Sequence, residues 1–106
     1  MRVLVDNCVP RQIAVMIVDH KVSTTAMLGW EKLKDGALLD AANGICDVFL
    51  TLDKGIRFQQ RLDHRSFGIV LMRAKSSRIE YLSPLLPELQ QLLLTVEPGQ
   101  FYVIGE

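Results

Sequence analysis

Two apolar segments of the chain end in an aspartate, and these carboxylates are the side chains best suited to chemistry. Residues 2–6 read Arg-Val-Leu-Val-Asp, and residues 47–53 run through Val-Phe-Leu-Thr-Leu to Asp53. A third acid, Asp35, opens a segment with helical spacing of its leucines and alanines. Three carboxylates at one edge repel one another unless a cation neutralises them, and Mg²⁺ or Mn²⁺ would do so because hard cations take oxygen ligands.

A block of basic residues directly follows Asp53. Residues 54–78 hold seven Lys or Arg and one acid, a net charge of +6, whereas residues 1–53 carry −2 and residues 79–106 carry −4. A basic surface beside a cation held by carboxylates is suited to binding and cleaving a nucleic acid backbone. The residues expected to bind nucleic acid are Lys54, Arg57, Arg61 and Arg73.

These side chains also have ordinary structural explanations, which the sequence leaves open. Asp6 and Asn7 could cap the next helix, and Asp35 could be a helix N-cap. Asp53 could be a turn residue in Asp-Lys-Gly, and the basic block could be a solvated surface. Cys8, just past Asp6, could be a reactive thiol, but nothing in its sequence neighbourhood indicates a lowered pKa.

The predicted order of strands and helices determines where the acids meet. Strands are predicted at residues 2–6, 21–26, 47–53, 67–72 and 101–104. Helices are predicted from Pro10, from Asp35 and from a capping-box pattern at Ser77–Glu80. This alternation, with strands apolar on both faces, predicts an α/β protein: a three-layer α/β/α fold with a mostly parallel central sheet of four to five strands. Ligands bind such sheets beyond the carboxyl ends of the strands, so Asp6 and Asp53 should converge there and Asp35 can reach the same rim.

Length and composition limit the class of protein. The 106 residues are expected to form a single domain over 1–106, and 49% hydrophobic residues suffice for a packed core. Apolar runs are too short for a membrane span, and the start of the chain does not resemble a signal peptide. A cytoplasmic protein with no membrane partner is therefore expected.

Four segments resemble, in the same order, the blocks of a family of short bacterial PIN-like domains. These segments read RVLVDNCVP, KDGALLDAA, VFLTLDKG and FGIVLMRA, and the resemblance spans about residues 1–95. PIN domains are parallel α/β/α nucleases, and many are toxins of toxin–antitoxin pairs that cleave RNA with Mg²⁺ or Mn²⁺. The resemblance implies a metal-dependent endoribonuclease of this type, in which Asp6, Asp35 and Asp53 bind the metal and act in catalysis.

Two departures from the family pattern remove a carboxylate each. Asn7 stands where the family usually has Glu, and Gly55 stands where it usually has a second Asp. The expected activity is therefore weakened, and a two-metal site is not favoured. The alternative is a catalytically impaired PIN-like module that binds a small antitoxin or another protein, and a homodimer is also compatible with the resemblance. A third reading, a receiver-type phosphoacceptor domain with phosphate on Asp53, lacks the required hydroxyl residue and lysine after the last two strands.

Overall fold

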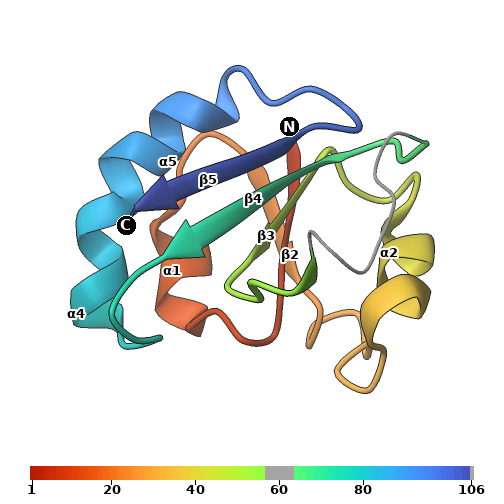
Figure 1. The fold of residues 1–106 in the computed structure, drawn as a ribbon, viewed down its shortest axis with the longest axis horizontal. Helices are drawn as coiled ribbons and strands as arrows, with labels where there is room; N and C mark the ends of the chain where they lie inside the picture. The colour runs from red at the N-terminus through yellow and green to blue at the C-terminus, as the bar shows by residue number, and fades with distance from the viewer. Residues whose placement is uncertain (57–63, 106) are drawn as a thin grey trace.

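Five short apolar segments form one sheet in which every described strand is parallel to its neighbours (Figure 1). The structure is a computed structural model that describes residues 1–56 and 64–105, without the side chain of Asp35. The strand order is β2-β1-β3-β4-β5. The strands are β1 (Arg2–Val5), β2 (Lys21–Thr24), β3 (Val48–Thr51), β4 (Gly68–Arg73) and β5 (Phe101–Gly105).

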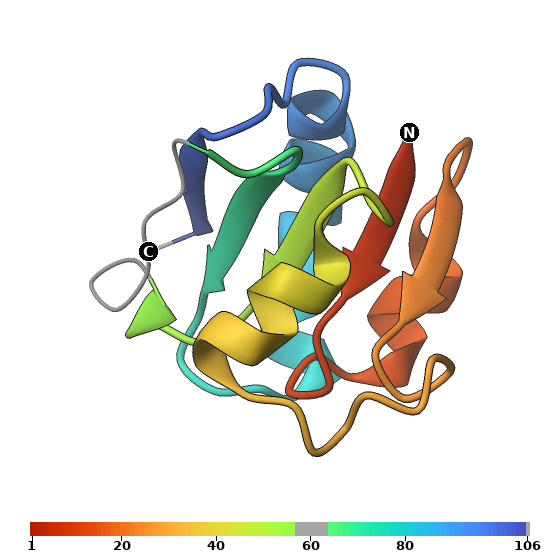
Figure 2. The same cartoon turned by 90° about the vertical axis from the view of Figure 1, so that its right-hand side faces the viewer.

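Helices cover both faces of this sheet. They are α1 (Arg11–Met16), α2 (Asp35–Ala42), α4 (Ile79–Leu82), the 3₁₀ helix η1 (Ser83–Leu85) and α5 (Leu86–Leu93). Among the described helices, Figure 2 shows α2 in front of the sheet and α1, α4 and α5 behind it. The α/β fold with three layers and a parallel sheet is therefore confirmed.

The alternation of side chains along the strands divides the core into two clusters. Val3 and Val5 pack on the side of α1, α4 and α5, whereas Leu4 packs with Phe49 on the side of α2. Every residue of β3 is buried, which explains why its sequence is apolar without alternation. The same alternation predicts on which face of the sheet the side chain at the end of each strand lies.

The helix starts differ from the sequence predictions. Arg78, not Ser77, is the N-cap residue of α4, with φ −67° and ψ 144° and no side-chain cap. The predicted capping box is therefore wrong, and the neighbouring Ser76 Oγ instead accepts a hydrogen bond from the Arg78 amide at 3.2 Å. Likewise Pro10 is the N-cap residue of α1 and no side chain caps that helix, so capping does not explain Asp6 and Asn7.

No helix within residues 1–56 and 64–105 is both long and apolar enough to cross a membrane.

Candidate functional site

The strand order reverses between β1 and β3, and this is where a doubly wound sheet offers a crevice for ligands. Both strands point the same way, so their carboxyl ends share one edge of the sheet. The Asp6 amide donates to the Leu50 carbonyl at 2.9 Å, which continues the ladder one residue past β1. Asp6 is therefore held beside Thr51 by backbone hydrogen bonding before its side chain makes any contact.

Among the described residues, three donors hold the Asp6 carboxylate. The Thr51 hydroxyl donates to Oδ2 at 2.7 Å and the Cys8 thiol donates to the same oxygen at 3.4 Å. The Asn7 amide donates to Oδ1 at 2.7 Å. Hydrogen bonds to an ionised acceptor are stronger than neutral ones, so these contacts fix the direction of the half-buried carboxylate.

Thr51 also connects Asp6 to the segment that carries Asp53. Its Oγ1 accepts a hydrogen bond from the Asp53 amide at 3.0 Å, so one buried hydroxyl links the two strand ends. The Asp53 carboxylate is exposed, and its Oδ1 accepts the Gly55 amide at 2.9 Å, as in an Asx turn. The structure thus brings the backbone of Asp53 to Asp6, and it also shows the turn that the sequence offered as an alternative role.

Thr51 is a functional residue that the pattern of acids and bases does not reveal, although the sequence contains a signal for it. The residue stands two positions after Phe49 and two before Asp53, so strand alternation puts it on the α2 face. Recognising its role requires the register between β1 and β3, which pairs Val5 with Leu50 and so puts Thr51 beside Asp6.

A second threonine, Thr25, lies on the other side of Asp6. The register pairs Val5 with Thr24, and the Thr25 amide donates to the Val5 carbonyl at 3.0 Å, which extends the ladder to Thr25 beside Asp6. Thr25 is only 1% exposed, and its Oγ1 has no hydrogen-bond partner among the described residues. A buried hydroxyl without a partner costs about 1–3 kcal/mol.

The oxygens at this edge are of the kind that a hard divalent cation binds. No group of three or more His, Cys, Asp or Glu side chains that could hold a metal occurs in the part of the chain that was described. The predicted role of the Asp35 side chain lies outside the described residues, although α2 begins with Asp35 at the carboxyl edge (Figure 2). The Asp6 carboxylate and the unpartnered Thr25 hydroxyl fit Mg²⁺ or Mn²⁺, which retain several waters and need few protein ligands.

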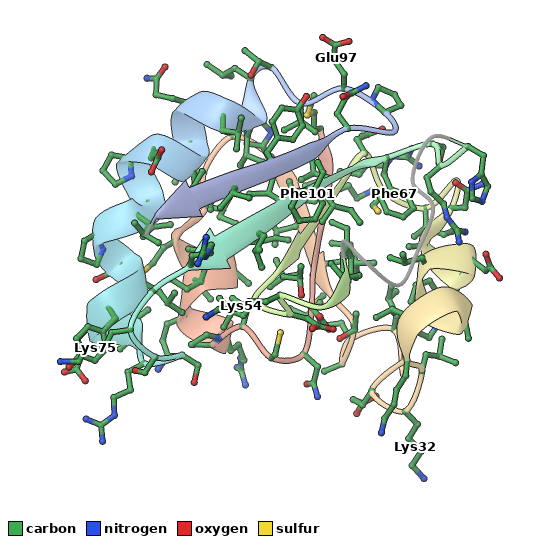
Figure 3. The ribbon with its side chains drawn as sticks, in the orientation of Figure 1. Lys32, Lys54, Phe67, Lys75, Glu97 and Phe101 are labelled. Atoms are coloured by element: carbon green, nitrogen blue, oxygen red, sulfur yellow. The ribbon has the colours of Figure 1, made fainter. Side chains whose placement is uncertain are left out.

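The described residues of the basic block differ in their exposure. Lys54, at the carboxyl edge (Figure 3), and Arg73, at the end of β4, are both exposed. Arg57 and Arg61 lie outside the described residues. Arg65 is buried and forms an ion pair with Asp40 of α2, so its guanidinium is used within the fold rather than available to phosphate.

The Cys8 thiol lies against the same carboxylate. Burial of the sulfur raises the pKa of the Cys8 thiol, the Asp6 carboxylate raises it further, and the Leu52 amide opposes the shift by donating to Sγ. Burial raises the pKa of Cys46 to about 12. Neither cysteine has the lowered pKa that an activated nucleophile needs.

We expect Cys8 to react with iodoacetamide at pH 8 more slowly than a free cysteine does, because its raised pKa leaves a smaller fraction of the thiol ionised. The rate should rise with pH, and Asp6→Asn should increase it at fixed pH by removing the neighbouring negative charge. Mass spectrometry after timed quenching measures the modification of each cysteine. Alkylation faster than that of free cysteine, or a rate unchanged by Asp6→Asn, would contradict the contact between thiol and carboxylate.

No family model, curated protein or solved structure matches this chain. The site therefore has to be interpreted from its own residues and from the doubly wound fold that positions them.

Proposed function

We propose that the chain is a PIN-like domain that binds one Mg²⁺ or Mn²⁺ at Asp6 and cleaves RNA weakly. The observation that supports this most is the position of Asp6 at the switch point of the sheet, with its carboxylate fixed by the Thr51 hydroxyl. A carboxylate held in one direction by its neighbours is a prepared ligand for a cation. The missing acids at positions 7 and 55 are why we propose one cation and low activity.

In this proposal the residues at the carboxyl edge of the sheet have different roles. Asp6 holds the cation, Asp35 and Asp53 bind it or orient water, and Thr51 is a positioning residue for Asp6. When bound, the cation would lower the pKa of water and stabilise negative charge on the phosphodiester. Lys54 and Arg73, both exposed, contact RNA phosphates, and Arg57 and Arg61 are proposed to do the same.

Cleavage of RNA by the purified chain tests this function. We expect end-labelled single-stranded RNA to be cut in Mn²⁺ or Mg²⁺, to stay intact in EDTA, and to be cut again when excess Mn²⁺ is added, because in this proposal the cation activates the attacking water. Lys54→Gln should weaken RNA binding and Lys21→Gln, exposed at the amino end of β2 on the opposite edge of the sheet, should not. Absence of cleavage with either cation, or cleavage that EDTA leaves unchanged, would contradict the proposal.

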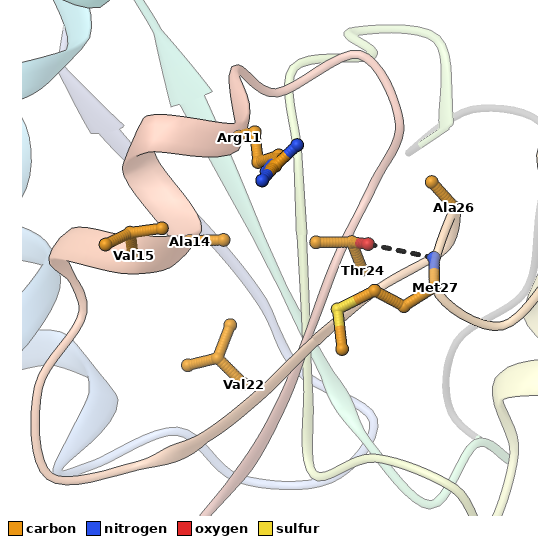
Figure 4. Close-up of a pocket in the computed structure, with 7 residues that line it drawn as sticks. All are labelled: Arg11, Ala14, Val15, Val22, Thr24, Ala26 and Met27. Carbon is orange, nitrogen blue, oxygen red and sulfur yellow. Dashed lines mark hydrogen bonds between the residues drawn. The ribbon is translucent and has the colours of Figure 1, made fainter.

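A second candidate function, an impaired PIN-like module that binds an antitoxin or other protein, is favoured by a different surface. A groove between α1 and β2 is lined by apolar side chains including Val15 and Met27, which are 77% and 71% exposed (Figure 4). Exposed apolar side chains gathered beside an edge strand are suited to protein contact. A chain that binds a protein through this groove but binds no Mn²⁺ would support this candidate over the first.

A further inference from the structure

Thr25 is a threonine at a position where valine would fill the same space at lower cost. Its side chain is 1% exposed and its hydroxyl has no partner within the described part of the chain. Valine has the same branched shape and no hydroxyl to desolvate. The hydroxyl therefore adds nothing to the packing of the core, which suggests that it serves a ligand.

The direction of the Thr25 side chain follows from the sheet. Thr24 lines the groove on the α1 side, where its Oγ1 accepts the Met27 amide at 3.0 Å (Figure 4). Although β2 ends at Thr24, the Thr25 amide still donates to the Val5 carbonyl at 3.0 Å, so the pairing continues one residue further and the alternation puts Thr25 on the α2 side. Asp6 and Thr51 also point to this side, because they continue the alternation of Leu4 and Phe49.

Three neighbouring strand ends thus present one row of oxygen-bearing side chains under α2: Thr25, Asp6 and Thr51. The Thr51 hydroxyl is used, since it donates to Asp6 and accepts the Asp53 amide. The Thr25 hydroxyl forms no hydrogen bond with the described residues, so its lone pairs can serve a ligand. The two threonines on either side of Asp6 therefore differ: the Thr51 hydroxyl holds the carboxylate, and the buried Thr25 hydroxyl has no partner in the described part of the chain.

We propose that Thr25 supplies an oxygen to the coordination shell of the divalent cation that Asp6 binds. This inference rests on the proposed function, because it requires a cation at Asp6. Thr25 would then be a cation ligand that is not an acidic residue. An additional oxygen ligand would help a site with few carboxylates among the described residues to retain a cation. Hydroxyl oxygens are suitable ligands for hard cations.

Mn²⁺ titrations of four forms of the full chain, followed by calorimetry, test the inference. Thr25→Val should raise the Kd for Mn²⁺ by about 10-fold or more, the size of effect usual for groups that support a metal site, and Thr25→Ser should stay near wild type. Asp6→Asn should abolish binding. In EDTA, Thr25→Val should melt at the same temperature as wild type or higher, because an unpartnered hydroxyl is removed.

The outcomes separate the two proposals. Wild type that binds no Mn²⁺, or binding that survives Asp6→Asn, would overturn the proposed function and this inference with it. Binding that is lost in Asp6→Asn but unchanged in Thr25→Val would overturn the inference alone. If Thr25→Val does not fold, comparison of Thr25→Ala with Thr25→Ser applies the same criterion.

Discussion

Replacing Asp6 with asparagine should lower Mn²⁺-dependent RNA cleavage by more than about 100-fold, because a direct ligand should matter more than the supporting groups of a metal site. Asparagine keeps the size of the side chain and one acceptor oxygen for the Thr51 hydroxyl, but it removes the negative charge. The loss should therefore be in function and not in folding. Initial rates on end-labelled RNA and circular dichroism of the same preparations measure the two effects separately.

Asp19→Asn is the matched control for this prediction. Asp19 is exposed in the turn before β2, at the opposite edge of the sheet from Asp6, and its φ of 66° is a conformation that asparagine adopts readily. The same chemical change should leave cleavage and folding unaffected. Equal cleavage rates for wild type and Asp6→Asn would show that Asp6 is not part of the catalytic site.

Phe49→Ala should lower the free energy of unfolding by about 3–5 kcal/mol, a large part of the 5–15 kcal/mol typical of a domain. Phe49 is 0% exposed in the centre of β3 and packs against Phe67, with ring centroids 6.4 Å apart. Its removal leaves a cavity in the core cluster between the sheet and α2. Urea unfolding followed by circular dichroism gives the difference.

The control for Phe49→Ala is Val15→Ala, a deletion on the exposed side of α1. Val15 is 77% exposed, so its change should stay within about 0.5 kcal/mol. A loss below about 1 kcal/mol for Phe49→Ala would mean that the α2 layer does not pack as described.

The sheet was predictable because its strands are apolar on both faces and are separated by turn residues. The predicted strand at 2–6 is observed as Arg2–Val5, and the predicted strand at 67–72 is observed as Gly68–Arg73. The strand ends differ by one or two residues, since an apolar run does not show where pairing stops. The position of Asp6 at the carboxyl edge followed from the alternation of strands and helices alone.

The contacts of the site could not be predicted from the sequence. Strand register puts Thr25 and Thr51 on either side of Asp6, and no spacing along the chain encodes this register. Asp53 belongs to a turn because Gly55 is near enough to donate its amide, a local alternative that the sequence leaves open. Arg65 belonged to the basic block by composition, and only its burial beside Asp40 shows a structural role.

The central claim is that a divalent cation binds at Asp6, and a crystal of the chain soaked in Mn²⁺ tests it most directly. An anomalous difference map should contain a peak about 2.1 Å from an Asp6 carboxylate oxygen, on the α2 side of the sheet. A map with no peak there, or with Mn²⁺ bound only at other surfaces, would contradict the claim.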